Sequence, residues 1–508
     1  MPESASRRAG MSALAPFAGR ARVGRSGAWT AGTLVLLAGV VTATTVSVRT
    51  GGVLARPGHI LFWYAVAWAM FAAACWAVRA VPVRRATAVI LAGSAVVALT
   101  GLAGPPSTSS DMFRYVWDGT VQAAGISPYA HPPAAPELAR LRDPWLFPPD
   151  SACQDPATIL RLELHTFPAA QDEPGARPTG CTRINRPQAH TIYPPVAEWW
   201  FFAVHELSPA DGRHKPFQAA GAVLAFATTA ALLAARRRRG RDPRTAALWA
   251  WCPAVPVEAV NNAHVDTLGV LLTVLALGIV GPGSRRGVLL GAATAVKLLP
   301  VLALLGSVVG RRSMLRTVAP AAVAFVLVYL PYAAVSGGRI LGYLPGYLKE
   351  EGYEPGDVRR FALLRLLLPD VAAVPVAATL IALTAVYIWR RGDPEQPWQG
   401  ALLMTGTTLT LVSPGYSWYA LLVVGLVALD GRAEWLAVPG AGAVLYVGSV
   451  AFPAMPLQEW AYGAAALVVC GAAAHRHWSG RGPSPAAETV MRVPQEAQPV
   501  ERNQEKRK

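Results

Sequence analysis

Apolar runs of about 18–22 residues recur along most of the chain, and polar, proline-rich or arginine-rich stretches separate them. A run of this length, wound as an α-helix, crosses the hydrocarbon core of a bilayer. The first three runs cover residues 29–48, 61–80 and 87–104, and a further series begins after residue 190. The pattern predicts an all-α, polytopic integral membrane protein with about eleven to thirteen transmembrane helices.

Polar segments divide the chain into parts. Residues 1–28 are arginine-rich and residues 475–508 are polar, so we expect cytoplasmic tails on either side of a transmembrane domain at 29–474. Residues 105–190 lack a run of membrane length, which predicts a large, folded extracytoplasmic loop after the third span. A second outer loop is expected at 336–360.

Composition and charge support a membrane location. The chain is 53% hydrophobic and only 15% charged, yet its net charge is +16. The basic residues cluster beside apolar runs, as at Arg84, Arg85 and Arg236–Arg239, which is typical of cytoplasmic ends and of contact with anionic lipids. We therefore expect membrane lipids rather than nucleic acid as partners, and a multi-pass protein of the plasma membrane.

Two segments complicate the topology. Two full crossings after the long loop would place Arg236–Arg239 outside, so either residues 193–207 lie along the interface or the arginine run is an exception. Arginine pairs also flank residues 287–310, which contain Pro300. Because proline interrupts helices, this segment predicts a broken hairpin that returns to the side it came from.

Two aspartates and an arginine follow the third span directly. Asp111 stands where the chain leaves the membrane, and a carboxylate at such a boundary suggests a catalytic base. The alternative is a helix cap or an ion pair with Arg114. Asp118, followed by a glycine, is expected to be structural or to orient an acceptor.

Four basic side chains are candidates for holding a phosphate. Arg114, Arg359 and Arg360 carry guanidinium groups that match phosphate oxygens. Lys297 lies within an apolar run, so it either faces a protein cavity or reaches to the cytoplasmic interface. Arg359 and Arg360 could equally flank the start of a helix.

Three further residues are candidate substrate contacts. His264 and Asp266 are two positions apart at the end of an apolar run, an arrangement that suits a sugar hydroxyl or a structural hydrogen bond. A third ligand at a known spacing is missing, so no metal site is assigned, although a divalent metal is not excluded. Tyr193, before two prolines, could stack on a sugar or anchor the interface.

Two of the five cysteines, Cys153 and Cys181, fall in the long loop. In an oxidising compartment they could pair as a disulfide, or both could remain free thiols.

Four motifs in this order resemble bacterial glycosyltransferase family 87, within the GT-C superfamily of polyprenyl-phosphate-sugar-dependent membrane transferases. They read SSDMFRYVWDGTVQAAGISPYAHPP, INRPQAHTIYPPVAEWWF, NNAHVDTLGVLL and GAATAVKLLPVLALL. The resemblance implies a many-helix fold with its active site at the outer face and an acidic catalytic residue in the first large outer loop, here Asp111. The family pattern has that loop after the first span, whereas two further spans precede it here.

The resemblance also implies an inverting hexosyltransferase. The donor would be a polyprenyl-phosphate sugar, most often mannose, and the acceptor an extracytoplasmic glycolipid or polysaccharide. No resident cofactor is expected, and the oligomeric state is not indicated. The alternative is a transporter or flippase of a lipid-linked glycan, although the internal repeat typical of many transporters is not seen.

Overall fold

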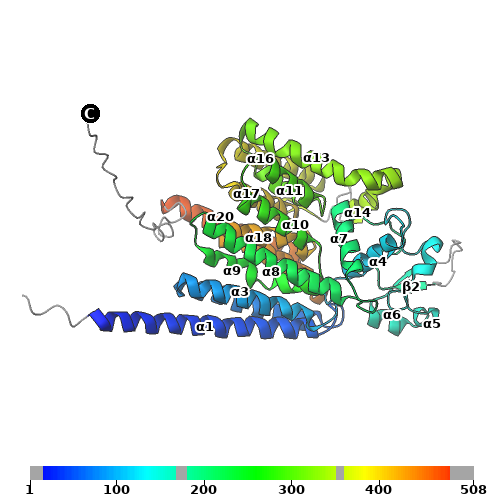
Figure 1. Cartoon of the computed structure of the whole chain (residues 1–508), viewed down its shortest axis with the longest axis horizontal. Coiled ribbons are helices and arrows are strands. Elements are labelled where there is room, and N and C mark those ends of the chain that lie inside the picture. Colours follow the sequence, from blue (N-terminus) through cyan, green and yellow to red (C-terminus); the bar gives the residue numbers. More distant parts are fainter. Residues whose placement is uncertain (1–14, 168–179, 351–359, 481–508) are drawn as a thin grey trace, which may run out of the picture.

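The computed structural model describes residues 15–167, 180–350 and 360–480, and side chains within these ranges except those of residues 15–26, 160 and 161. Helices make up nearly all of the regular structure, as expected (Figure 1). The α-helices are α1 (Ala15–Arg49), α2 (Pro57–Ala77), α3 (Val83–Thr100), α4 (Asp111–Ala123), α5 (Asp150–Cys153), α6 (Pro156–Leu162), α7 (Pro195–Glu206), α8 (Lys215–Arg238), α9 (Ala247–Ala250), α10 (Asp266–Val274), α11 (Ser284–Thr294), α12 (Val301–Gly306), α13 (Gly310–Ser336), α14 (Leu344–Glu350), α15 (Ala362–Arg365), α16 (Asp370–Arg391), α17 (Pro397–Val412), α18 (Leu421–Asp430), α19 (Ala437–Ala451) and α20 (Leu457–Trp478).

Shorter helical turns and one small sheet complete the described structure. The 3₁₀ turns are η1 (Val78–Ala80), η2 (Gly101–Ala103), η3 (Pro136–Leu141), η4 (Pro243–Ala246), η7 (Gly337–Leu341), η8 (Ser417–Ala420) and η9 (Ala433–Leu436), and the π-helical segments are η5 (Val255–Asn261) and η6 (Leu275–Ile279). Strands β1 (His165–Phe167) and β2 (Gly180–Thr182) pair antiparallel, with Thr166 opposite Cys181.

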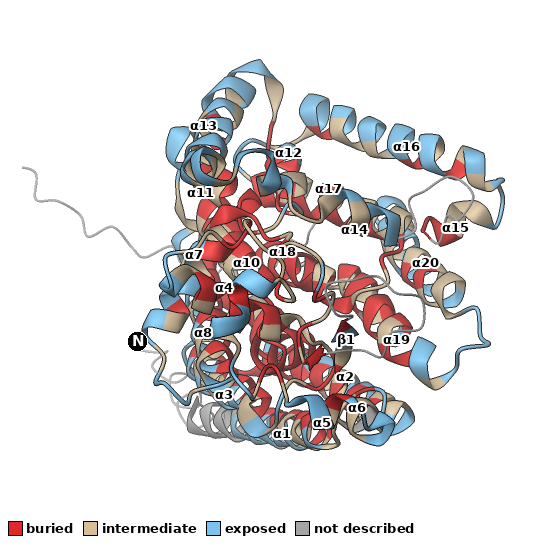
Figure 2. Cartoon of the chain, turned by 90° about the vertical axis from the view of Figure 1, so that its right-hand side faces the viewer, coloured by how far each residue is buried: buried red, intermediate tan, exposed pale blue. Residues whose placement is uncertain are grey.

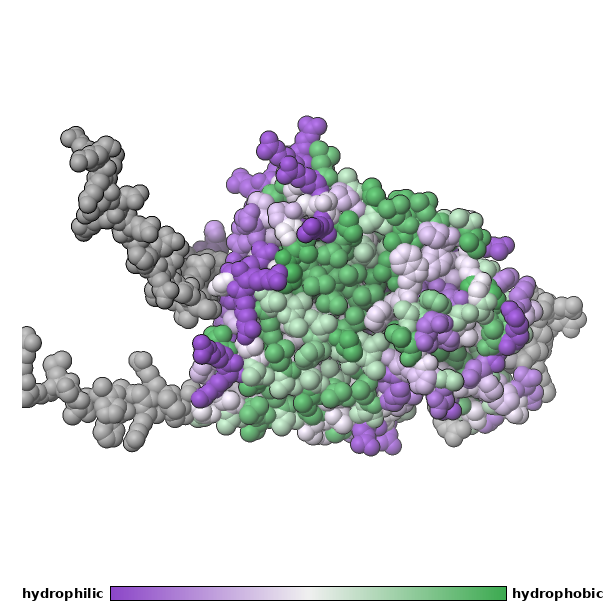
Figure 3. Space-filling model, viewed as in Figure 1, coloured by the Kyte–Doolittle hydropathy of each residue, from purple (hydrophilic) through white to green (hydrophobic). Residues whose placement is uncertain are grey.

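A broad apolar belt crosses the middle of the face seen in Figure 3, between two more polar ends. Seven of the described helices are long and apolar enough to cross a membrane, or eight if a bent pair counts as one span. This count is lower than the eleven to thirteen spans expected, because several apolar runs fold as shorter or broken helices. For example, Ser417–Asp430 is apolar but too short to cross alone.

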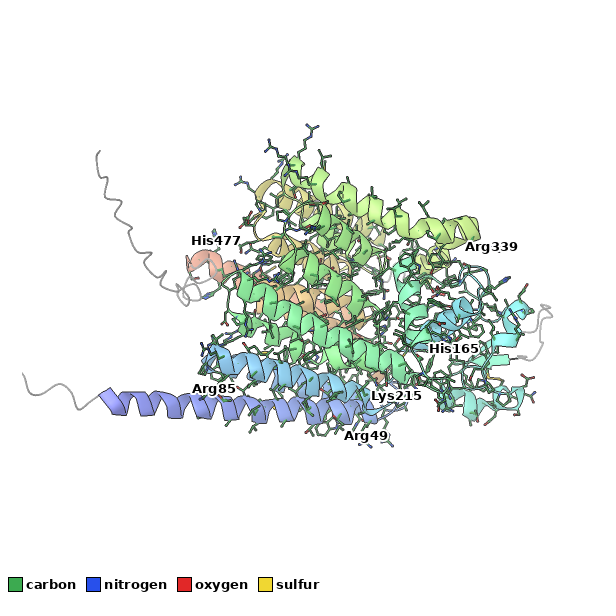
Figure 4. The ribbon with its side chains drawn as sticks, in the orientation of Figure 1. Arg49, Arg85, His165, Lys215, Arg339 and His477 are labelled. Atoms are coloured by element: carbon green, nitrogen blue, oxygen red, sulfur yellow. A yellow bond between two sulfur atoms is a disulfide. The ribbon has the colours of Figure 1, made fainter. Side chains whose placement is uncertain are left out.

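The two ends of the belt differ in what they carry. Arg85 and His477 lie at one end, which we call the arginine end, whereas Arg49, Lys215 and Arg339 lie at the other (Figure 4). The second end also carries α4 to α7 and the small sheet, and we call it the loop end (Figure 1). Helix α1 begins at Ala15, inside the stretch expected to be a tail.

The position of helix α7 explains how Arg236–Arg239 can lie at the same end as the other arginine clusters. It is a 12-residue helix that packs on α4 at the loop end, so residues 193–207 do not cross the belt. Helix α8 then crosses once, from Lys215 to the arginine end. There Arg237 donates to the Thr87 hydroxyl at 2.8 Å and Arg244 donates to the Val81 carbonyl, both beside the start of α3.

Two broken helices line the centre of the bundle. The first pair, η5 and the helix Asp266–Ile279, is bent by 115° at residues 262–265. The second is the hairpin of α11 and α12, which turns at residues 295–300 before α13 begins at Gly310. The turn holds both arginine pairs near one end, as the sequence predicted, and it places Lys297 inside the protein.

The main core runs through α3, α8, η5, α10, α18 and α19, with Trp249 and Trp251 among its fully buried side chains. Helices α13 and α16 stand at the edge of the bundle with mostly exposed residues (Figure 2). Their exposed positions are largely apolar, which suits lipid-facing helices. Burial by protein is therefore concentrated around the bent pair.

The loop end carries a separate small core. Trp117 and Val121 of α4 pack with Leu138, Leu146 and Phe167 of the residues that follow. A disulfide joins Cys153 to Cys181, with their Cα atoms 5.4 Å apart. These contacts fold the long loop over α4.

Candidate active site

Asp111 is the first residue of α4, which lies at the loop end and follows the candidate span Val83–Ala103 (Figure 1). Its Oδ1 atom accepts a hydrogen bond from Asn185 Nδ2 at 2.8 Å, and its Oδ2 atom lies 3.8 Å from His264 Nδ1. The side chain is 16% exposed, so one edge of the carboxylate remains open. The N-terminal position also places the negative charge at the positive end of the α4 dipole.

Behind Asp111 lies a buried carboxylate that sequence reasoning missed. Glu258 of η5 lies 3.4 Å from His264 Nε2, so the imidazole stands between two carboxylates. Glu258 also accepts hydrogen bonds from Ser417 Oγ at 2.5 Å and from Asn262 Nδ2 at 3.0 Å. The ring of His264 stacks on Trp418, with centroids 4.1 Å apart.

The paired asparagines of the third motif fix the segment before Asp111. Asn261 Oδ1 accepts hydrogen bonds from the backbone and the hydroxyl of Ser107, and its Nδ2 atom donates to the Pro105 carbonyl. Asn262 Nδ2 donates to Thr108 Oγ1 at 2.6 Å. The bend at residues 262–265 therefore positions the start of α4 as well as His264.

Lys297 and Asp266, both chosen as candidates, form an ion pair. Lys297 Nζ donates to Asp266 Oδ2 at 2.7 Å and lies 5.0 Å from the centre of the Tyr419 ring. Asp266 is the first residue of α10, and Lys297 sits in the turn of the α11–α12 hairpin. The lysine thus faces a protein interior rather than lipid or the arginine end.

Two arginines interact with the same group of tyrosines as Lys297. Arg360 is buried and interacts electrostatically with Tyr347, Tyr416 and Tyr419, and burial lowers the pKa of its guanidinium. Tyr347 and Tyr419 hydrogen-bond to each other through their hydroxyls.

Arg186, which sequence reasoning missed, is the second arginine of this group. Its guanidinium lies 5.7 Å from the Tyr347 ring and donates to Glu350 at 2.5 Å. Burial opposes its charge, but the bond to Glu350 raises the pKa of Arg186 overall. Three positive side chains therefore surround one aromatic group, which we call the tyrosine cluster (Tyr347, Tyr416 and Tyr419).

Arg114 and Asp118 serve the packing of α4. Arg114 donates to the carbonyls of Asn185, Arg186 and Ala189, so it fixes the returning end of the loop and is not paired with Asp111. Asp118 is 2% exposed and faces Glu198 of α7, which is fully buried. Burial raises the pKa of Asp118 to about 6, against the nearby Arg114 charge.

Tyr193 and Arg359 do not add to this geometry. The Tyr193 ring packs between Tyr115 and Phe201, and its carbonyl accepts a hydrogen bond from Tyr129. The structure places it in a buried apolar cluster under α4. Arg359 lies outside the described residues.

The structure brings Asp111, His264, Asp266, Lys297 and Arg360 to one region. Asn185, Arg186 and Glu258 were not selected from the sequence, because their partners lie far away along the chain. Glu258 had one usable signal, since an acidic residue inside an apolar segment is costly unless it is paired. Among the described residues, no group of three or more His, Cys, Asp or Glu side chains could hold a metal ion.

A model of a known protein family matches part of the chain. Residues 191–414 match the family model for glycosyltransferase family 87, whereas no curated protein and no solved structure matches the chain. The matched part includes His264, Lys297 and Arg360, but it begins after the motif that contains Asp111. The resemblance to glycosyltransferase family 87 is thus confirmed over residues 191–414, and it supports a membrane glycosyltransferase.

Proposed function

We propose that the chain transfers a hexose, namely mannose, from a polyprenyl-phosphate donor to an extracytoplasmic glycolipid or polysaccharide, with inversion at the anomeric carbon. Asp111 is the general base. The observation that carries this proposal is its geometry: a partly exposed carboxylate, hydrogen-bonded by Asn185, at the start of α4 and at the boundary that follows the candidate span Val83–Ala103. A donor with a lipid tail and a polar head would meet the protein at this boundary.

The reaction assigns one task to each group. Asp111 takes the proton of the acceptor hydroxyl as its oxygen attacks the anomeric carbon from the face opposite the phosphate. The bond between that carbon and the phosphate oxygen breaks, and the electron pair leaves with the phosphate. Arg186, Arg360 and Lys297 interact with the tyrosine cluster, and they would stabilise this developing charge.

The tyrosine cluster suits the sugar itself. Aromatic faces offer flat apolar surfaces, and the hydroxyls of Tyr347 and Tyr419 already form a hydrogen-bonded pair. Tyr347 interacts electrostatically with Asp111 as well as with Arg186. Both the proposed base and one of the proposed phosphate-binding cations therefore interact with the cluster, which supports it as the surface that binds the sugar ring.

Transfer of radiolabelled mannose from polyprenyl-phosphate mannose into membrane lipid or polymer tests the proposal. Membranes with the wild-type protein should incorporate label, and Asp111→Asn should slow transfer by about 10²–10⁴-fold, as loss of a general base does. Asp150→Asn is the matched control, because Asp150 also begins a helix in the loop but is exposed. It should transfer at the wild-type rate.

The possible outcomes separate the parts of the proposal. Equal transfer by the wild type and Asp111→Asn would remove Asp111 as the base while keeping the transferase. Transfer only from another polyprenyl-phosphate sugar would change the sugar and keep the reaction. Failure with every such donor and acceptor would overturn the proposal in favour of the flippase alternative.

A further inference from the structure

His264 occupies a position that suits neither a substrate contact nor a simple core residue. It is 1% exposed, so the protein rather than the open site surrounds it. Its two ring nitrogens face carboxylates on different elements, Asp111 at 3.8 Å and Glu258 at 3.4 Å. Neither nitrogen has a hydrogen-bond partner among the described residues, and burying an unpaired polar group costs free energy.

We infer that His264 is a positioning residue that orients the Asp111 carboxylate, with Glu258 holding the imidazole from behind. This inference rests on the proposed role of Asp111 as the base. The orienting role of His264 requires a proton on Nδ1, because a ring nitrogen can hold a carboxylate only by donating an N–H group to it.

The frame around the imidazole fits an orienting role. Trp418 covers one face of the ring, and the bend at residues 262–265 fixes its backbone. Glu258 is fixed in turn by Ser417 and Asn262. A chain of contacts thus runs from the core through Glu258 and His264 to the carboxylate of Asp111.

Other charged groups near Asp111 do not supply this constraint. Among the described residues, no other basic nitrogen lies within 4.0 Å of its carboxylate. Arg114, on the same helix, is occupied by backbone carbonyls. Tyr115, Tyr193, Tyr347 and Tyr446 interact with Asp111 electrostatically, from α4, the segment before α7, α14 and α19 respectively.

Two substitutions of His264 test whether its side chain orients Asp111 or only stabilises the position of Glu258. In His264→Asn the amide nitrogen lies near the place of Nδ1 and retains a donor toward Asp111. In His264→Gln it lies near the place of Nε2 and retains a donor toward Glu258 instead. Orientation of the base predicts that His264→Gln loses more activity than His264→Asn.

The expected effect is on kcat rather than on KM. His264→Gln should lower kcat by about 10²-fold, the size expected when a reacting group is misplaced by about 1 Å, with KM within about twofold of wild type. His264→Asn should lose less than about tenfold, and it should unfold at a lower temperature than His264→Gln. The reverse order of kcat would overturn the inference, because it is the order expected if His264 only supports Glu258.

A second measurement does not depend on transferase activity. Melting temperatures of Asp111→Ala, His264→Gln and the double variant in detergent form a double-mutant cycle. If the two side chains interact, the two effects will not add. Additive effects would overturn the inference, whereas non-additive effects without any transfer by the wild type would overturn the proposed function alone.

His477→Gln is the control for both measurements. It lies at the arginine end, away from the site (Figure 4), and it should match wild type in kcat and melting temperature. A cycle of Asp111→Ala with His477→Gln should be additive.

Discussion

At the scale of single residues, Lys297 and Asp266 show how two charged side chains can be buried when they form an ion pair. Asp266 is 7% exposed and Lys297 is 18% exposed at the side chain, and each satisfies the other at 2.7 Å. Removing one partner leaves an uncompensated charge, whereas removing both leaves none. Single and double substitutions can therefore distinguish this buried ion pair from a surface ion pair.

Lys297→Met should lower the free energy of unfolding by about 3–5 kcal/mol, because Asp266 would stay buried without a partner. The double variant Lys297→Met/Asp266→Asn should recover much of that loss. Unfolding in detergent, followed by tryptophan fluorescence, measures both. A double variant as unstable as the sum of the single variants would contradict the pairing.

At the scale of elements, the carboxyl pair between α4 and α7 makes their packing sensitive to pH. Asp118 and Glu198 are both buried, and burial raises the pKa of each carboxyl, that of Asp118 to about 6. Since the folded-state pKa of Asp118 exceeds its ordinary value of 3.8, the protonated form fits the folded protein better. Its contribution to stability is complete below about pH 4 and is lost as the pH rises through about 6.

Asp118→Asn should flatten this dependence. The wild-type melting temperature should fall as the pH rises from about 4 to 7, and the variant should fall less, because its amide carries no charge to bury. A slope unchanged by Asp118→Asn would show that other groups set the pH dependence. Asp150→Asn, in the exposed part of the loop, controls for the loss of one carboxylate.

Two glycines allow η5 to lie close to its neighbours. A Cβ atom at Gly221 of α8 would come within 2.0 Å of the Ala259 carbonyl oxygen, and one at Gly101 within 2.4 Å of the Pro256 carbonyl oxygen. Both contacts are with backbone, so the elements would have to move apart. The position of Glu258, which lies on η5 between them, depends on this close approach.

Gly221→Ala should therefore destabilise the protein by about 1–3 kcal/mol, the cost of overpacking, and lower transfer by displacing Glu258. Gly32→Ala on α1 is the control, because nothing lies within 4 Å of its added Cβ atom. Equal unfolding of the two variants in detergent would show that the α8–η5 contact relaxes easily.

The sequence predicted the elements better than the contacts between them. Apolar runs predicted the helices, and the arginine pairs with Pro300 predicted the hairpin that contains Lys297, because both signals are local. Residues 193–207 remained ambiguous, since a 12-residue interfacial helix and a short span have similar hydropathy. Glu258 and Asn185 were missed because their contacts with His264 and Asp111 depend on tertiary folding, which local patterns do not encode.

At the scale of the whole molecule, charge separates the two ends of the bundle. Arginines near the starts of α3, α11 and α13 and the end of α8 lie at the arginine end, whereas the long loop and its disulfide lie at the other. By the positive-inside rule, we propose that the arginine end is cytoplasmic and the loop end extracytoplasmic. Helix α8 offers a direct test, because exposed residues flank it on both sides.

Asp211 lies just before α8 at the loop end, and Arg238 is the last residue of α8, at the arginine end. Both residues are exposed, so each can be replaced by a cysteine for labelling. In intact cells a membrane-impermeant maleimide should label Asp211→Cys and should label Arg238→Cys only after permeabilisation. Cys470→Ala removes the exposed native thiol from the background. Labelling of both variants in intact cells would contradict a single crossing by α8, and the reverse pattern would place Asp111 in the cytoplasm, where an extracytoplasmic acceptor cannot reach it.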